Sequence, residues 1–352
     1  VVSFLGLPRR FGGTVSFLAV DLSWSSGFTF GLLLDVCVVT SSDDVYGDDP
    51  SVNFLQEKVA KLLGKEAALL VSSGTQSNLC AMMAHCQPGE EILTGDHYHV
   101  FMDEAGGASV LGGIMFAPLV TQDNVGLSVE EIQEKIKPDD EHCAISKMLS
   151  LENTHQGRVL DVNEVSTLAS CGHKNGLSVH LDGARLMNAI VKLNVDPKAI
   201  VANVDSVSLC LSKGLGTPAG SVLSGSAEFI KKAKRIRKLL GGGLRQAGIL
   251  AAAGVYALEN NIDRMVIDHE NAIRLAEQLN SFPQICVDLE NVQTNMVFIE
   301  LDDGVAQHFR QHLLKKGMLI GAGDKVIRLV THLNSSQNDI DLFVSEVDAF
   351  FN

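Results

Sequence analysis

The chain has 352 residues, of which 46% are hydrophobic and 20% are charged, and its formal net charge is −14. This composition is typical of a globular protein with a sizeable core and room for two lobes. The acidic excess argues against nucleic acid or an anionic membrane as the main partner, and the longest apolar run near the start, residues 30–39, is too short to span a bilayer. Seven cysteines without a CxxC pair indicate reduced thiols in an intracellular protein, most simply a cytoplasmic one, with mitochondria as the alternative.

The chain divides into three parts by pattern. Residues 1–42 sustain neither a helical nor a strand period, and we expect an atypical or incorrectly joined N-terminal segment. Regular patterns begin at residue 43, and the composition shifts near residue 258 to a short series of helices and strands. We therefore predict a large domain over 43–257 and a small α+β domain over 258–352.

The first regular stretch predicts a helix over 51–63, a strand over 67–71 and then a small polar turn, Ser72 to Thr75, that opens a second helix. Backbone N–H groups and the positive end of a helix dipole face such a turn, and small side chains let an anion approach closely. The turn is therefore a candidate phosphate site. The alternative is an ordinary helix cap by Ser73 or Thr75.

Two histidines follow predicted strand ends. His99 comes shortly after a strand over 91–94, and His155 follows an apolar run that ends at Glu152. A histidine at such an edge can stack on a planar ligand or transfer a proton near neutral pH. Each could equally be a hydrogen-bonded loop residue.

Asp182 and Lys213 form the strongest constellation. Asp182 ends a strand predicted over 178–181, and Lys213 follows an alternating apolar run, 207–211, that a Gly/Pro cluster terminates. A helix-length segment separates the two strands, so we expect parallel neighbours whose ends face one ligand. A partly desolvated lysine is nucleophilic and can form a Schiff base with a carbonyl substrate or pyridoxal phosphate.

Each of these two residues also has a simpler interpretation. A buried carboxylate such as Asp182 is costly unless it is paired. It could be a helix N-cap or the partner of Arg185 in a structural ion pair, but an anion is also what a protonated pyridine nitrogen requires. Lys213 could be an ordinary surface lysine.

Two arginines further along the chain attract attention. Arg245 follows a triple glycine at 241–243, where it could reach a neighbouring molecule. Arg328 interrupts the apolar strand predicted within 325–333. It is either an edge residue with its charge in solvent or a carboxylate clamp, because the planar guanidinium suits bidentate binding.

Several motifs together resemble the low-specificity threonine aldolases, which depend on pyridoxal phosphate (PLP). The resemblance runs in order from about residue 43 to 350 and implies an α/β fold of PLP fold type I, the aspartate-aminotransferase-like fold, with a mainly parallel sheet in the large domain. It is carried by VYGDDP (45–50), SSGTQSN (72–78), HVFMDEAGG (99–107), SLENTH (150–155), VHLDGARLMNA (179–189), SVSLCLSKGLG (206–216), LGGG and RQAG (240–248) and IRLVTH (327–332).

The resemblance implies roles at the cofactor. Lys213 would hold PLP covalently, Asp182 would pair with its ring nitrogen, and His99 would stack on its ring. Arg245 would serve the cofactor site of the neighbouring subunit in a homodimer or homotetramer whose active site lies at the subunit interface. The cofactor phosphate would be bound by Gly74, Thr75 and Gln76.

The resemblance also implies the substrate contacts and the reaction. Arg185 and Arg328 would bind the carboxylate of a small-molecule amino acid, His155 would lie near its hydroxyl, and either His99 or His155 would be the base. No metal ligand is expected. The reaction would be retro-aldol cleavage of threonine or allo-threonine to glycine and acetaldehyde.

Two other readings stay open at this point. One is another lyase or an aminotransferase of the same fold, and the other is a PLP-binding paralogue with impaired activity. The second follows from a departure at the N-terminus, where Ser23 to Ser26 follow Val20-Asp21-Leu22 in place of the family's V-D-L-R-S-D pattern. The serine of that pattern helps to bind the substrate carboxylate, so that pocket could be incomplete.

Overall fold

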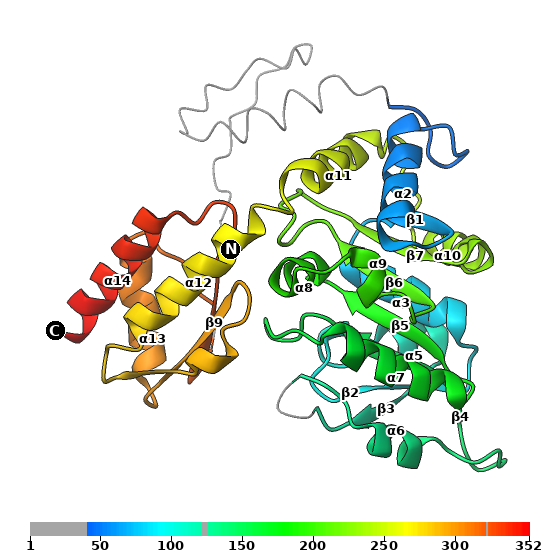
Figure 1. Cartoon of the computed structure of the whole chain (residues 1–352), viewed down its shortest axis with the longest axis horizontal. Coiled ribbons are helices and arrows are strands. Elements are labelled where there is room, and N and C mark those ends of the chain that lie inside the picture. Colours follow the sequence, from blue (N-terminus) through cyan, green and yellow to red (C-terminus); the bar gives the residue numbers. More distant parts are fainter. Residues whose placement is uncertain (1–40, 122–124, 322) are drawn as a thin grey trace.

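The computed structural model describes residues 41–121, 125–321 and 323–352. Two sheets organise them, one of seven strands in the order β1-β7-β6-β5-β4-β2-β3 and one of three in the order β10-β9-β8 (Figure 1). The strands of the large sheet are β1 (Ala67–Val71), β2 (Glu90–Gly95), β3 (Met115–Leu119), β4 (Ile145–Glu152), β5 (Ser178–Gly183), β6 (Ser206–Cys210) and β7 (Ser221–Gly225). Those of the small sheet are β8 (Ile285–Val287), β9 (Met296–Leu301) and β10 (Val326–Val330).

The large sheet is mostly parallel. Strands β3, β2, β4, β5 and β6 pair in parallel, whereas β7 is antiparallel to both of its neighbours, β6 and β1. The residues of β6 and β7 are buried throughout, as expected for strands that helices cover on both faces. The five parallel strands therefore bring their carboxyl ends to one edge of the sheet, where ligands bind in open α/β sheets.

Helices cover both faces of this sheet (Figure 1). On one face α3 (Gly74–His85) contacts α5 (Gly107–Gly112) and α10 (Ala227–Leu239). On the other, α2 (Pro50–Leu63) and α7 (Val162–Lys174) both contact α9 (Pro197–Ile200). The remaining helices of this part are α4 (His99–Met102), α6 (Val129–Lys135), α8 (Leu186–Leu193) and α11 (Gly248–Asn260).

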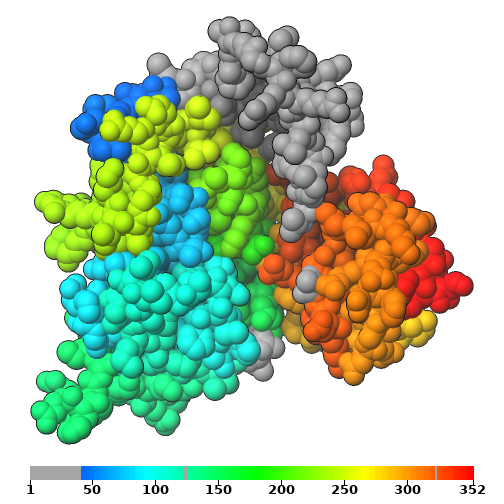
Figure 2. Space-filling view, turned by 180° about the vertical axis from the view of Figure 1, so that it is seen from behind, coloured from blue at the N-terminus to red at the C-terminus, as the bar shows by residue number. Residues whose placement is uncertain are grey.

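The C-terminal part has its own core beside the small sheet. Helices α12 (Met265–Leu279), α13 (Val305–Lys315) and α14 (Gln337–Phe351) pack their apolar faces with β8, β9 and β10 into a cluster that runs from Ala272 to Val347. Figure 2 shows these residues, in orange and red, as a separate mass beside the larger part. The second core agrees with a small C-terminal domain, although the exact boundary at residue 258 stays a prediction.

The predicted fold class, a mainly parallel α/β sheet followed by a small α+β part, is confirmed. The prediction for the N-terminal segment falls on residues 1–42, almost all of which lie outside the described residues. Within the described part, none of the six cysteines forms a disulfide. None of the described helices has the length and apolar character needed to cross a membrane.

Candidate active site

Three strand ends meet at the centre of the large sheet. In the register, Glu152 at the end of β4 pairs with Asp182 on β5, and Asp182 pairs with Ser208 on β6. Gly183 follows Asp182 where a Cβ atom would lie only 2.5 Å from the Ser208 carbonyl oxygen, so no larger residue fits there. Lys213 lies half-buried in the loop after β6. Asp182 therefore lies near the end of β5 and Lys213 just beyond the end of its parallel neighbour β6, as predicted.

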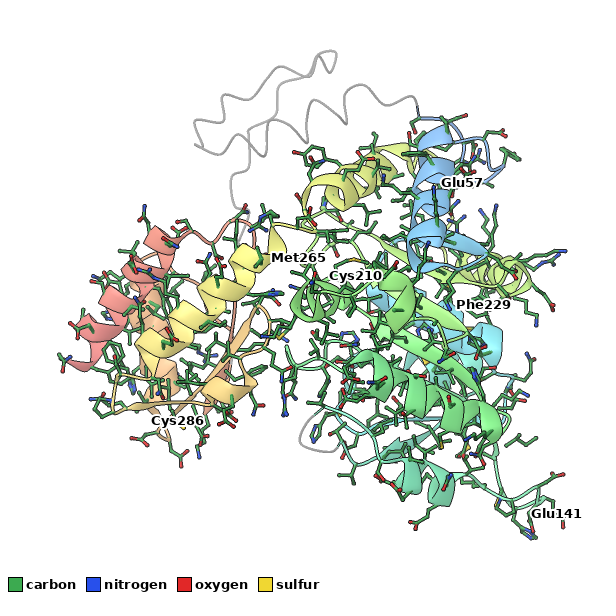
Figure 3. All side chains as sticks on the ribbon, viewed as in Figure 1. Glu57, Glu141, Cys210, Phe229, Met265 and Cys286 are labelled. Atoms are coloured by element: carbon green, nitrogen blue, oxygen red, sulfur yellow. The ribbon has the colours of Figure 1, made fainter. Side chains whose placement is uncertain are left out.

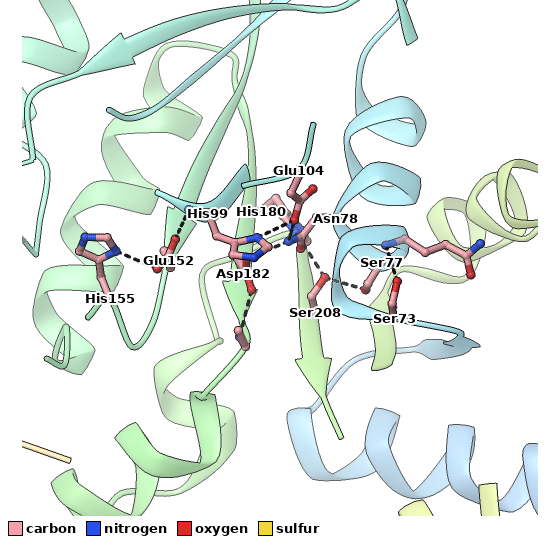
Figure 4. Close-up of polar contacts among 12 residues, drawn as sticks. Ser73, Ser77, Asn78, His99, Glu104, Glu152, His155, His180, Asp182 and Ser208 are labelled. Carbon is pink, nitrogen blue, oxygen red and sulfur yellow. Dashed lines mark hydrogen bonds and ion pairs between the residues drawn. The ribbon is translucent and has the colours of Figure 1, made fainter. Parts of the chain in front are cut away.

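The Asp182 carboxylate is buried and held on both oxygens. Its Oδ2 accepts a hydrogen bond of 2.8 Å from the Asn78 amide of α3 (Figure 4). Its Oδ1 accepts one of 3.0 Å from the Ala184 N–H. Burial and the nearby Glu152 and Glu104 raise the pKa of Asp182 to about 6, and the positive charge of Lys213 opposes that rise. The simpler interpretations fail, because Arg185 occupies the N-cap of α8 and no ion pair links the two residues within the described chain.

His99 begins α4 beside the same carboxylate. Its Nδ1 lies 3.0 Å from Glu104 Oε1, and this hydrogen bond, with the charge of Asp182, raises the pKa of His99 above its ordinary value. Its side chain is 36% exposed, which leaves part of the ring accessible. His99, Glu104 and Asp182 each place one atom that could bind a metal ion within 4.8 Å of the others. These atoms already form hydrogen bonds with each other or with Asn78.

His155 lies on the other side of Glu152 and is 2% exposed. Its Nδ1 is 2.7 Å from Glu152 Oε1, while Glu152 Oε2 accepts a 2.6 Å hydrogen bond from the backbone N–H of His99. A carboxylate at Nδ1 fixes the proton there and leaves Nε2 as an acceptor. That Nε2 is buried and has no hydrogen-bond partner among residues 41–121, 125–321 and 323–352.

The N-terminus of α3 offers donors for an anion. Ser73 caps the helix by accepting from the Gln76 N–H at 3.1 Å, as one of the two sequence interpretations predicted, so the N–H groups of Gly74 and Thr75 remain directed out of the first turn. Ser221 Oγ is buried without a hydrogen bond in the described part of the chain, and lies 3.7 Å from where a Cβ on Gly74 would be. The Gln76 side chain instead accepts from Ser72.

Arg185 and Arg328 are close enough to influence each other. Burial and the charge of Arg328 lower the pKa of Arg185 to about 10. The Arg185 Nε is buried and has no hydrogen-bond partner among the described residues, whereas Arg328 is exposed on β10, an edge strand. Arg185 also lines a small pocket with Cys210 and Met265, and Figure 3 shows these two side chains where the two parts of the protein meet. Two neighbouring guanidinium groups with free donors fit a carboxylate.

The structure keeps Arg245 away from this cluster. Its side chain is 59% exposed, pairs with Asp43 at 2.6 Å and lies over the Tyr46 ring at 5.8 Å. The preceding triple glycine lies against α3, since a Cβ atom on Gly242 would be 2.3 Å from the Gln76 amide. Arg245 thus faces outward from a loop that borders the N-terminus of α3.

The sequence interpretation missed several residues of the site. Asn78 donates to both Asp182 and Glu104, and Glu152 joins His99 to His155. Glu152 had the same signal as Asp182, a carboxylate at the end of an apolar strand. Asn78 had a weaker signal, its position one turn after Gly74 on the helix that opens at the predicted phosphate site.

The residues present fit the groups of PLP. A buried carboxylate suits a protonated pyridine nitrogen, a half-buried lysine suits its aldehyde, and a helix N-terminus with a buried hydroxyl suits its phosphate. These three features lie near the carboxyl-end edge of the large sheet, because they come from α3, β5 and the loop after β6. The arginines and His155 are left for a substrate.

Comparison with known proteins agrees with this reading. The family model described as "Beta-eliminating lyase" matches residues 34–302. The chain is 46% identical over 298 residues to the low specificity L-threonine aldolase of Escherichia coli K12, which covers 85% of this chain and 88% of that protein. The similarity therefore extends over most of both proteins.

Solved structures share the fold. A Leishmania major threonine aldolase superposes with a TM-score of 0.78 at 20% identity, covering 93% of this chain and 96% of the other. A serine palmitoyltransferase variant from S. paucimobilis with bound PLP gives a TM-score of 0.71 at 16% identity, covering 93% and 84%. These similarities confirm PLP fold type I. The chain belongs to the beta-eliminating lyase family and, within it, to the low-specificity L-threonine aldolases.

Proposed function

We propose that this protein is a PLP-dependent carbon–carbon lyase that cleaves L-threonine and L-allo-threonine to glycine and acetaldehyde. The observation that carries the proposal is the meeting of Asp182, Lys213 and the Glu152–His155 pair at one edge of the sheet. The first two residues suit PLP, and the pair supplies a buried acceptor for a proton. Family membership supports the same activity.

The cofactor is held by groups from three elements. Bound PLP supplies an electron sink for the negative charge left on Cα when the Cα–Cβ bond breaks. Lys213 provides the amine, Asp182 provides the negative charge at the ring nitrogen, and His99 lies beside them with its ring partly accessible. Gly74 and Thr75 bind the phosphate through their N–H groups, and Gln76 supports the turn by binding Ser72.

The substrate is held by its carboxylate between Arg185 and Arg328. Arg185 has a buried Nε without a partner in the described chain, and each arginine lies in the other's electrostatic field. Binding an anion there relieves the repulsion between two positive charges. Such binding would also fix the orientation of the bonds to Cα within the site, which is an orientation effect on rate.

We assign the base to His155. The Nε2 of His155 is a buried acceptor, and Glu152 stabilises the positive charge that forms when Nε2 takes the β-hydroxyl proton. His99 is engaged through Nδ1 with Glu104 and is half-exposed, so it suits ring packing better than proton abstraction.

The proposal includes a homodimer or homotetramer with Arg245 acting on the partner's cofactor. Arg245 is exposed, and the neighbouring Leu244, together with Ile249 at the start of α11, expose 41% and 54% of their surface. A mixture of Lys213→Ala and Arg245→Ala chains tests this, because a mixed dimer would have one intact site. Recovery of roughly a quarter of wild-type activity is expected for random pairing. No recovery would place Arg245 at the site of its own chain, and full activity of Arg245→Ala alone would show that it serves no site.

The reaction itself is tested by acetaldehyde release from the two threonine isomers with purified protein and added PLP. Release from either isomer supports the aldolase. Formation of 2-oxobutanoate and ammonia instead would indicate β-elimination, and a 2-oxo acid formed with transfer of the amino group would indicate an aminotransferase. Binding of PLP without any product would indicate the impaired paralogue.

A further inference from the structure

A row of buried polar side chains runs between helix α3 and strands β5 and β6, from the edge of the protein to Asp182. Asn78 and His85 are seven residues apart on α3 and so share one helix face. His180 and Asp182 share one face of β5, and Ser206 is the register partner of His180 on β6. Ser206 and His180 are fully buried, and Asn78 and Asp182 are buried almost completely.

The short hydrogen bonds of this row can be assigned a direction; His180 Nε2 also has a longer contact of 3.5 Å with Ser208 Oγ. Asn78 uses both protons of its amide, one on Glu104 Oε1 and one on Asp182 Oδ2, each at 2.8 Å. Its Oδ1 must therefore accept from His180 Nε2, at 3.2 Å, which places the proton of a neutral His180 on Nε2. His180 Nδ1 then accepts from the Ser206 hydroxyl at 2.8 Å (Figure 4 shows Asn78, His180 and Asp182).

The far end of the row closes in the same direction. Because the single Ser206 proton goes to His180, Ser206 Oγ accepts from His85 Nε2 at 2.8 Å. The His85 ring stacks on Phe229 with 4.5 Å between centroids, which holds its orientation. Burial lowers the pKa of His180 to about 3 and that of His85 to about 4, so both rings are neutral at physiological pH.

The row therefore directs N–H dipoles toward the buried carboxylates of Asp182 and Glu104, and it adds no net charge. Such an arrangement favours the ionised carboxylate, as an N–H donor does for any anion. It opposes burial and the neighbouring acids, which favour protonation of Asp182. The charged or titratable groups that face Asp182 are Glu104, Glu152, His99, Lys213 and Arg185.

We propose that Asn78 and His180 are positioning residues that keep Asp182 anionic and fixed against the ring nitrogen of PLP, so that this nitrogen stays protonated. The inference rests on the proposed cofactor site and extends it to residues that do not touch the cofactor. Asn78 acts directly on Asp182, while His180, held in one tautomer by Ser206, acts through Asn78 by keeping the amide from rotating. Neither residue takes part in bond breaking.

A purely structural role makes a different prediction, so the test measures the ring nitrogen. Protein loaded with PLP labelled with ¹⁵N in the ring is titrated by NMR without substrate. His180→Leu removes the donor to Asn78 while keeping the volume, and His180→Gln restores an N–H at a similar position. Ser206→Ala is a milder variant for the case in which His180→Leu does not fold.

The pKa of the ring nitrogen is expected to fall by about one unit, a tenfold change, in His180→Leu. It should fall by less in Ser206→Ala and hardly at all in His180→Gln. A structural role alone would lower the melting temperature and leave the ring nitrogen titration unchanged in all three variants, which would overturn the inference. Equal shifts in His180→Leu and His180→Gln would also overturn it. Failure of the wild-type protein to bind labelled PLP would instead refute the proposed function, so the two failures are distinguishable.

Discussion

Glu152 lies 2.7 Å from Nδ1 of His155 through one carboxylate oxygen, and this contact leaves the opposite ring nitrogen of His155 buried and unbonded within the described structure. A histidine held in this way has one defined tautomer and one nitrogen able to take a proton. This contact distinguishes His155 from His99, which the sequence alone left as equal candidates for the catalytic base.

Replacing His155 with Asn should lower kcat about 10²- to 10⁴-fold, the usual contribution of a general base. The visible absorption of the bound cofactor should change little, because His155 is not among the groups proposed to hold PLP. His99→Asn is the matched control and should weaken cofactor binding more than it lowers kcat. If His99→Asn lost kcat while His155→Asn kept it, the assignment of the base would be reversed.

Replacing Lys213 with Ala should abolish the visible absorption band of bound PLP, because no amine would remain to hold it covalently. Lys232→Ala is the control, since Lys232 is exposed on α10 and pairs only with Glu228 in the described ion pairs. Absorption spectroscopy after dialysis measures both variants. An unchanged band in Lys213→Ala would refute the assignment of this lysine.

Replacing Arg328 with Ala should raise the KM for threonine by about ten- to a hundredfold, the loss expected for hydrogen bonds to a charged group. The dissociation constant of PLP should change much less, because Arg328 lies on β10 and not among the cofactor groups. Arg274→Ala, which removes an exposed ion pair with Asp341 in the same part of the protein, is the control. Similar losses in substrate and cofactor binding would count against the clamp.

Stability should fall as the pH drops below about 6.5, and His180 should contribute to that fall. Its pKa is lowered from 6.5 to about 3, so the unfolded chain binds a proton that the folded chain refuses, and the stabilisation present above pH 6.5 is lost as the pH falls toward 3. Each such histidine contributes a slope of about 1.4 kcal/mol per pH unit. His85, whose pKa is lowered to about 4, acts in the same direction.

The pKa of Asp182, raised from 3.8 to about 6, acts in the opposite direction, because its folded form holds a proton that the unfolded form has lost. Its contribution is present below pH 3.8 and is lost as the pH rises through 6. Urea unfolding at pH 7 and pH 5 measures the balance. The difference between the two pH values should be smaller in His180→Leu than in the wild type, and an equal or larger difference would contradict a neutral His180.

The sequence alone was sufficient for the elements whose pattern is local. Strand 67–71 is present with the predicted bounds, and the helix predicted over 51–63 is present as α2, which begins one residue earlier, because apolar patterns and clear turn residues define both. The edge strand β3, the antiparallel strand β7 and the short strand β8 were missed. The pairing of β7 with both β1 and β6 depends on contacts between distant segments, and no local pattern reports it.

The site was predictable where chemistry coincided with a strand end, as at Asp182 and Lys213. It was not predictable where a side chain acts through another, as Asn78 does on Asp182 and Glu152 does on His155. Asn78 and Asp182 lie 104 positions apart in the chain, so no local pattern links them. Glu152 and His155 are only three positions apart, but their 2.7 Å side-chain contact depends on how the backbone turns after β4. The role predicted for Arg245 stays a prediction, because it requires a second chain.

The most direct test of the central claim follows the fate of both halves of the substrate. L-threonine labelled with ¹³C at all four carbons is incubated with the wild-type protein and PLP, and with Lys213→Ala in parallel, and the products are followed by NMR. We predict glycine and acetaldehyde in equal amounts with the wild type and neither with the variant. A four-carbon 2-oxo acid as the product, or equal glycine release by both proteins, would contradict retro-aldol cleavage at this site.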